Sequence, residues 1–376
     1  MKKKRILFIS NELTVTGAPL VLLRLCRLAA AKGFRADVWS MTDGPLRTEL
    51  EAEGFAVKIV PIEATGQHFM ALPLRRYGLA VCSTVITADF AALCARHIPT
   101  AWIFHEAANV ADILPGASEK FRRIVRHFPE IYCVSEYAAA ELEKYTDAEI
   151  RLLPNFVEDR PVIPNVCTPA EPLRFLQLGT VEPRKGSDVL LEAFSLLSAE
   201  ERAGAELFFA GACPDNEFTR EFKNKLAALP QARLLGELRE EGKKLQTLAA
   251  ADVIAVASRD EACSLVALEG AMLAKPLLVT ENVGAKYLVD RKNGWVVETA
   301  NAGALSMALR DALSHRAELT EMGRVSRERY EKLASPAACE GKAAEIFALA
   351  GTEKTEAFQI KKKRWKEIYA AQIVQR

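Results

Sequence analysis

The stretch Arg174–Leu197, with the sequence RFLQLGTVEPRKGSDVLLEAFSLL, carries the pattern on which the fold prediction rests. A β-rich apolar run, Arg174–Leu178, leads through the turn Gly179–Gly186 into a helical run, Asp188–Leu197. Alternation of strand, turn and helix favours a parallel sheet with helices on both faces. Ligands of such sheets bind beyond the carboxyl ends of the strands.

The same alternation extends in both directions along the chain. Further strands are predicted at Arg5–Ser10, Ala36–Trp39, Val57–Val60, Leu79–Ser83, Ala101–Phe104, Ile131–Val134, Ile150–Leu153, Leu207–Ala210, Arg233–Leu235, Val253–Ala257, Leu277–Val279 and Trp295–Val297. Further helices are predicted at Leu20–Ala31, Glu217–Leu229, Lys243–Ala250, Leu265–Leu273, Ala302–Leu313, Glu318–Lys332 and Pro336–Ala350. The fold class is therefore α/β, with two doubly wound Rossmann-like domains that face each other across a ligand-binding cleft.

A proline-rich stretch interrupts the alternation and divides the chain. Five prolines lie between Pro154 and Pro172, which is typical of a stiff interdomain linker. We expect an N-terminal domain at 1–165 and a C-terminal domain at 166–350. The basic segment 351–376 is expected to be a final helix that returns to the first domain, or a mobile tail.

Composition excludes several classes of protein. Half of the 376 residues are hydrophobic and 26% are charged, which excludes global disorder. With 50 Lys and Arg against 49 Asp and Glu, the net charge of +1 argues against a nucleic-acid binder. No apolar run is long enough to span a membrane, and the eight scattered cysteines fit neither zinc spacing nor a disulfide framework. We therefore expect a cytoplasmic protein.

Two adjacent cations stand in the turn after Leu178. Gly179 opens this turn, and Arg184 and Lys185 lie between a proline and Gly186 at the mouth of the strand. Arg offers a planar fork to phosphate oxygens and Lys a point charge. The alternative is a solvated basic turn.

Two glutamates follow the strand Val253–Ala257. Glu261 lies in the loop, and Glu269 lies within the next helix, behind a run of apolar residues. A buried carboxylate needs partners, which the hydroxyls of a ligand can supply. The helix start near Ser264 and Leu265 offers free N–H groups to a diphosphate. The alternative is a pair of unrelated glutamates, one exposed and one in a salt bridge.

The N-terminal half offers an imidazole and a glycine. His105 closes the strand Ala101–Phe104, where it can orient a sugar hydroxyl or move a proton; the alternative is a satisfied core histidine. Gly17 lies between the strand Arg5–Ser10 and the next helix, where it permits close approach of a ligand. An ordinary strand-to-helix turn is the alternative there.

Taken in order, these residues resemble the retaining, nucleotide-sugar-dependent GT-B glycosyltransferases of family 4, over roughly residues 5–350. The resemblance is carried by the Gly17 loop, His105, the turn LPNFV at 153–157, GTVEPRKG at 179–186, Gly211, and the glutamates 261 and 269.

The resemblance implies a role for each of these residues. Arg184 and Lys185 would hold the diphosphate of the donor within the turn that Gly179 opens. The backbone N–H groups near Ser264 and Leu265 would also contact phosphate.

The resemblance implies that the glutamates and the N-terminal domain would bind the rest of the donor. Glu269 would bind the ribose hydroxyls, and Glu261 would contact the transferred sugar. His105 would contact the sugar from the N-terminal domain, and the Gly17 loop would approach the phosphates or the acceptor. The resemblance further implies retention of anomeric configuration and no requirement for a metal or other cofactor.

The predicted function is transfer of a sugar from a nucleoside diphosphate sugar to a saccharide or lipid-linked acceptor, in cell-envelope or exopolysaccharide synthesis. Two alternatives stay open: a nucleotide-sugar epimerase of related fold, and a non-catalytic homologue that binds nucleotide or glycan.

The segment Glu119–Phe128, EKFRRIVRHF, raises the question of a membrane partner. Its apolar residues recur at helical spacing among arginines and a lysine, as in a basic amphipathic helix. Such a helix can contact the anionic inner face of a membrane, near a lipid-linked acceptor. The alternative, which we favour, is an ordinary helix with its apolar stripe in the core.

Overall fold

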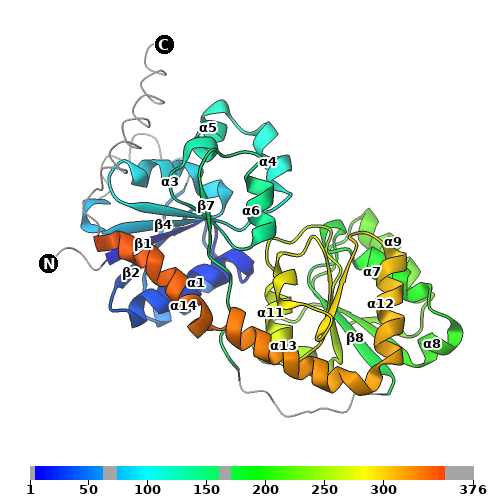
Figure 1. Cartoon of the computed structure of the whole chain (residues 1–376). Helices are drawn as coiled ribbons and strands as arrows, with labels where there is room; N and C mark the ends of the chain where they lie inside the picture. Colours follow the sequence, from blue (N-terminus) through cyan, green and yellow to red (C-terminus); the bar gives the residue numbers. More distant parts are fainter. Residues whose placement is uncertain (1–4, 62–73, 161–170, 352–376) are drawn as a thin grey trace. The chain divides into compact units, whose positions relative to one another are not determined.

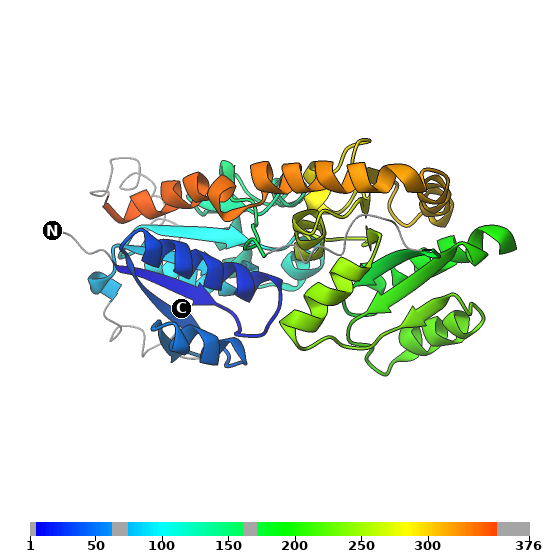
Figure 2. The ribbon, with the colours of Figure 1, turned by 90° about the horizontal axis from the view of Figure 1, so that it is seen from below.

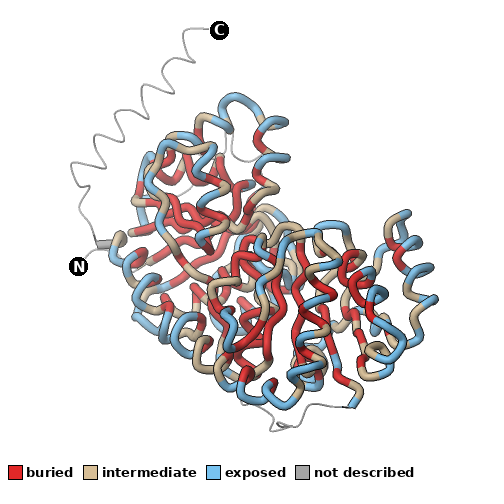
Figure 3. Tube along the Cα trace, turned by 45° about the vertical axis from the view of Figure 1, so that its right-hand side comes forward, coloured by how far each residue is buried: buried red, intermediate tan, exposed pale blue. Residues whose placement is uncertain are grey.

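The structure of the protein is a computed structural model that describes residues 5–61, 74–160 and 171–351. These residues divide into two compact units. The first holds the described residues up to Leu153 together with those from Glu340 onward, and the second holds those of Pro154–Cys339. In each unit the strands run through the buried interior (Figure 3).

The first unit is built on a parallel sheet with the strand order β3-β2-β1-β4-β5-β6-β7 (Figure 1). The strands are β1 (Arg5–Ser10), β2 (Arg35–Ser40), β3 (Ala56–Ile59), β4 (Leu79–Ser83), β5 (Thr100–Phe104), β6 (Ile131–Cys133) and β7 (Ile150–Leu152). The order changes direction between β1 and β4, and the carboxyl ends of such strands are where ligands of doubly wound sheets bind.

Helices cover this sheet, and α1 lies along it in Figure 2 (blue). The helices are α1 (Gly17–Ala31), α2 (Leu46–Ala52), α3 (Ala88–Ala95), α4 (Val110–Gly116), α5 (Glu119–His127) and α6 (Glu136–Leu142). Because both faces are covered, the central strands are continuous apolar runs, and every residue of β5 is buried.

The helix α14 (Pro336–Ala348) brings the C-terminal part of the described chain into the first unit from Glu340 onward. The ring of Phe347 packs 5.9 Å from that of Phe34, centroid to centroid, and Glu340 pairs with Lys32. The segment expected to return to this domain, within 351–376, lies outside the described residues beyond Gly351.

The second unit repeats the design with the strand order β10-β9-β8-β11-β12-β13, again all parallel. The strands are β8 (Leu173–Leu178), β9 (Ala205–Ala210), β10 (Ala232–Leu234), β11 (Val253–Val256), β12 (Leu277–Thr280) and β13 (Gly294–Val297). The helices are α7 (Ser187–Ser195), α8 (Ala199–Ala203), α9 (Glu217–Ala227), α10 (Glu241–Ala250), α11 (Leu265–Met272), α12 (Ala302–Ser314) and α13 (Leu319–Leu333).

The boundary between the units differs from the expected one at 165/166. Phe156 and Val157 are buried, and Val157 donates its N–H to the carbonyl of Ala334 at 3.1 Å and accepts from the hydroxyl of Tyr330 at 3.0 Å. Burial and pairing therefore tie the start of the proline-rich stretch to the second unit. At its other end this unit stops at Cys339 rather than at 350, because α14 joins the first unit.

The apolar stripe of α5 lies in the core. Ile124, Val125 and Phe128 are each at most 1% exposed, and Ser118 caps the helix by accepting the N–H of Phe121. Phe121, the remaining residue of the stripe, is only partly buried. Most of the stripe therefore packs in the core, as the ordinary interpretation of this segment expects.

Candidate functional site

The turn after β8 needs glycine for steric reasons. Gly186 has φ of +65°, and a Cβ at this position would lie 2.0 Å from the carbonyl oxygen of Ala257. Gly211, after β9, has φ of +145°, and its Cβ would lie 2.1 Å from the carbonyl oxygen of Gly179. These contacts bring the ends of β8, β9 and β11 together closely, which side chains would prevent.

This packing brings the two cations of the turn to Glu261. Lys185 and Arg184 both bind the same oxygen, Oε2 of Glu261, and the distance from Nη1 of Arg184 is 3.2 Å. Arg184 also donates to Glu182 at 2.8 Å and to the carbonyl of Asp260 at 3.1 Å. Three of the predicted site residues therefore form one cluster, in which carboxylates pair with the two cations.

The loop that carries Glu261 is held on two sides. Its backbone pairs with the loop after β12, through bonds from Glu261 N–H to Asn282 and from Gly284 N–H to Glu261. On the other side, Arg259 makes two bonds to the carboxylate of Asp188, at 2.8 and 2.7 Å. Sequence reasoning did not assign this bidentate pair, which fixes the loop to the first turn of α7.

The start of α11 follows directly. Ser264 is its N-cap and accepts the N–H of Ala267 at 3.3 Å, while the first N–H groups, at Leu265 and Val266, have no acceptor within the helix. Burial raises the pKa of Cys263 to about 12, so this thiol stays protonated at neutral pH. The groups next to Glu261 are therefore the N–H groups of a helix start, a type of group that can accept an anion.

Glu269 lies within α11 and is 7% exposed, as its apolar neighbours predict. Its Oε1 accepts a bond from Lys244 of α10 at 2.6 Å. Its Oε2 is covered from solvent and has no hydrogen-bond partner among the described residues. One oxygen of this carboxylate is therefore paired, and the other is buried without a hydrogen-bond partner among the described residues.

In the first unit, His105 follows β5, with Glu106 beside it. The buried carboxylate of Glu106 accepts the backbone N–H of Val85 and that of His105, each at 3.0 Å. Burial lowers the pKa of His105 to about 4 and raises that of Glu106 to about 7. Thr84, which follows β4 and directly precedes Val85, has the strained φ of +73°. At neutral pH the imidazole is uncharged, so it can act as a hydrogen-bonding group.

Gly17 begins α1 and lies in open space, with no atom within 4 Å of a Cβ placed there. The fold itself therefore does not require glycine at this position. Nearby, the hydroxyls of Thr14 and Thr16 bond to each other at 2.8 Å. The predicted approach of a ligand to this loop stays a prediction, as does the meeting of His105 with the cluster of the second unit.

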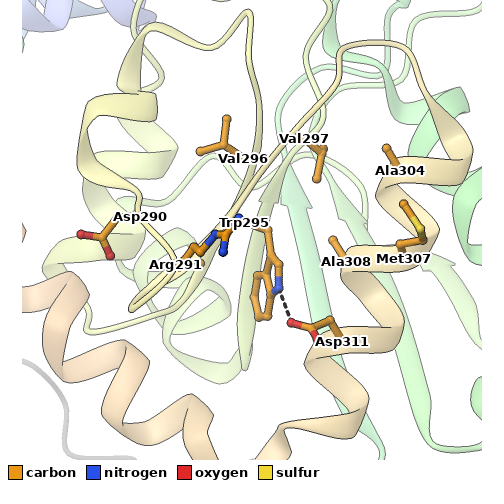
Figure 4. A pocket seen from close by; sticks show the side chains of 10 residues that line it. Asp290, Arg291, Trp295, Val296, Val297, Ala304, Met307, Ala308 and Asp311 are labelled. Atoms are coloured by element: carbon orange, nitrogen blue, oxygen red, sulfur yellow. Dashed lines mark hydrogen bonds between the residues drawn. The ribbon is translucent and has the colours of Figure 1, made fainter.

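A separate groove of about 730 Å³ lies between β13 and α12 (Figure 4). The indole of Trp295 crosses it and donates to Asp311 at 2.7 Å, and Met307 and Val296 are exposed beside it. None of the predicted site residues lines this groove, so it is distinct from the candidate site.

Neither a metal cluster nor a membrane-spanning helix is found in the part of the chain that the structure describes. Over these residues no three His, Cys, Asp or Glu side chains are grouped as metal ligands. Over the same residues no helix combines the length and the apolar character that crossing a bilayer needs.

Two family models match the chain. The model described as Glycosyl transferases group 1 matches residues 164–329, and the model described as Glycosyltransferase Family 4 matches residues 15–160. Among curated proteins, the chain is 30% identical over 167 residues to D-rhamnosyltransferase WbpZ of Pseudomonas aeruginosa. This match covers 43% of the chain and spans only 42% of that protein.

Solved structures share the fold at low identity. Anabaena Alr3699/HepE, in complex with UDP and glucose, has a TM-score of 0.75 and 16% identity, over 92% of this chain and 99% of that one. A glycosyltransferase from Rickettsia africae has a TM-score of 0.78 and 17% identity, over 94% and 100%. WaaG, a glycosyltransferase involved in lipopolysaccharide biosynthesis, has a TM-score of 0.68 and 16% identity, over 91% and 99%.

The two parallel Rossmann-like sheets are the fold that these structural neighbours, which are GT-B glycosyltransferases, share with the chain. The sequence matches point the same way: the C-terminal half resembles the group 1 glycosyltransferases and the N-terminal half those of family 4, and the two matched regions together span most of the chain.

Proposed function

We propose that the protein transfers a hexose-type sugar from a nucleoside diphosphate sugar to a saccharide or lipid-linked acceptor, with retention of anomeric configuration. The observation that carries this proposal is the cluster of Arg184, Lys185 and Glu261 beside the start of α11. Two cations and free helix N–H groups suit a diphosphate leaving group. The matches to glycosyltransferase models support the reaction class.

Donor binding exchanges the internal partners of the two cations. In the free protein Arg184 and Lys185 are bound to carboxylates, chiefly Glu261. The diphosphate takes the place of these carboxylates, because its oxygens match the same donors and carry more charge. Glu261 is then released to accept bonds from the hydroxyls of the sugar. Glu269 accepts from the ribose hydroxyls.

In the transfer step, the bond between the anomeric carbon and the phosphate oxygen breaks, and a bond to the acceptor oxygen forms on the same face. The proton of the acceptor hydroxyl passes to the departing phosphate. Arg184 and Lys185 stabilise the charge that develops on that phosphate, so the chain's own cations supply the charge that a metal would otherwise provide. His105, uncharged at neutral pH, orients a sugar hydroxyl.

The test is acceptor-dependent release of nucleoside diphosphate from a panel of UDP- and GDP-sugars. We expect Lys185→Ala to lower turnover by about 100-fold or more, because it removes a cation that stabilises the departing phosphate. Glu261→Ala should also lower turnover, because it removes the acceptor of the sugar hydroxyls. Lys225→Ala, which removes an exposed lysine of α9 in the same unit, is the matched control and should keep full activity.

Three results would contradict the proposal in different ways. Unchanged turnover in the Lys185 and Glu261 variants would remove the assigned site. Isomerised sugar without any acceptor would identify an epimerase. Nucleotide binding without turnover on any acceptor would identify a non-catalytic homologue.

We also propose that the surface beside α5 contacts the membrane near a lipid-linked acceptor. Charged side chains alone make this contact. A hollow of about 620 Å³ beside α5 is lined by four cations and three acids, and Arg123 and Arg126 pair there with Glu119 and Asp147. The cations are Arg122, Arg123, Arg126 and Lys144, and the acids are Glu119, Glu143 and Asp147. We expect Arg123→Glu with Arg126→Glu to weaken cosedimentation with phosphatidylglycerol vesicles, since anionic lipid attracts such cations. Lys225→Glu is the control. Equal binding by both variants would contradict the contact.

A further inference from the structure

The ion pair between Lys244 and Glu269 joins two helices of the second unit. Lys244 lies on α10 and Glu269 on α11, and these helices pack against each other. The ammonium nitrogen is 2.6 Å from Oε1 of the carboxylate. The side chain of Glu269 is 9% exposed and that of Lys244 is 23% exposed, so the lysine reaches a buried acid from the edge of the site.

Only one of the two oxygens of the Glu269 carboxylate has a hydrogen-bond partner among the described residues. A carboxylate has about four hydrogen-bond acceptor positions, but Oε2 of Glu269 has no partner among the described residues and is covered from solvent. Leaving a buried charged oxygen unpaired carries the full cost of taking that oxygen out of water. A pair that served only to join α10 to α11 would be expected to satisfy both oxygens, and apolar residues of similar volume would serve at least as well.

The orientation of the carboxylate depends on Lys244. The ammonium group holds Oε1, so Oε2 is the oxygen left without a hydrogen-bond partner among the described residues. Without the lysine, the acid would be buried with no cation beside it. In that condition it would lose its ordered direction and its charge would be disfavoured.

We propose that Lys244 is a positioning residue for nucleotide recognition, which holds the Glu269 carboxylate so that its free oxygen accepts the vicinal hydroxyls of the ribose. This inference rests on the proposed function, because it takes Glu269 as the ribose-binding group. It predicts that Lys244 affects affinity only through the ribose hydroxyls, and not through the phosphates or the base.

The test is a double-perturbation experiment, with one change in the protein and one in the ligand. Affinities for UDP and GDP and for their 2′,3′-dideoxy counterparts, which lack both hydroxyls, are measured by calorimetry. We expect Lys244→Met to weaken binding of the ribonucleotide by about tenfold and binding of the dideoxy forms by less than about twofold, so that the preference for ribose is largely lost. Lys243→Met, an exposed neighbour on α10, is the matched control and should keep the preference.

The possible outcomes separate this inference from the proposed function. Equal weakening of all nucleotides by Lys244→Met, or tighter binding of the ribonucleotide, would overturn the role of Lys244. A full ribose preference in Glu269→Gln would instead overturn the assignment of Glu269, and with it part of the proposed site. Lys244→Arg keeps a cation on the carboxylate and should restore the preference. Failure of that rescue in a folded variant would also count against the inference.

Discussion

At the scale of single residues, His105 and Glu106 have pKa values that are shifted in opposite directions. Burial lowers the pKa of His105 from 6.5 to about 4 and raises that of Glu106 from 4.5 to about 7. When the pH falls from 6.5 to 4.5, His105 takes up a proton in the unfolded chain only, which lowers stability. Over the same range Glu106 holds a proton in the folded chain only, which raises stability.

The contributions of the two groups to the pH dependence of the unfolding free energy therefore offset each other. Variants that remove one group at a time should reveal them. Relative to the wild type, Glu106→Gln should lose up to about 1.4 kcal/mol of unfolding free energy per pH unit as the pH falls from 6.5 to 4.5. His105→Asn should gain stability over the same range, with a similar slope. Urea denaturation at several pH values measures both, and parallel curves for the three proteins would contradict the shifts.

At this scale the sequence predicted which side chains belong to the candidate site better than it predicted which residues they pair with. Arg184, Lys185 and Glu261 were expected in one site, and the structure brings them together. Glu106 and Lys244 received no role, although Glu106 stands next to His105 in the sequence. Glu106 accepts the backbone N–H of Val85, which follows another strand, and Lys244 binds the carboxylate of Glu269 on another helix. Pairs of this kind leave no signal in the local sequence.

At the scale of elements, the turn between β8 and α7 depends on the absence of a side chain. Gly186→Ala should cost at least about 1–2 kcal/mol for the left-handed backbone, and more for the contact with the carbonyl of Ala257. Gly204→Ala is the control, since its Cβ would meet only an ordinary contact at 3.6 Å and its φ is −88°. Equal melting temperatures for the two variants would contradict this account of the turn.

The strands and helices themselves were largely predictable. Each strand named from sequence matches an observed strand to within about two residues at its ends, because runs of β-branched and apolar residues between turn signals mark buried parallel strands. Short helices such as α2 and α8 were not named, since one or two turns carry too few residues to show a period.

At the scale of the whole molecule, ligand binding should stabilise the fold. A nucleoside diphosphate at about 100 times its Kd adds roughly 2.7 kcal/mol to the unfolding free energy, which a thermal-shift panel detects. We expect a clear shift with one nucleoside diphosphate and a smaller one in Lys185→Ala. Inorganic pyrophosphate giving the same shift as the nucleotide would contradict recognition of the nucleoside through Glu269.

The sequence by itself determined the α/β class, the two parallel sheets and the positions of the cations and carboxylates at strand ends. These features follow from periodicity and turn chemistry over a few residues, which the chain carries locally. Only the tertiary structure decided that Glu261 pairs with both cations, that Lys244 binds Glu269, that most of the stripe of α5 is buried and that α14 belongs to the first unit. Each of these depends on contacts between residues far apart in the chain, where packing and burial, and not local pattern, select the partner.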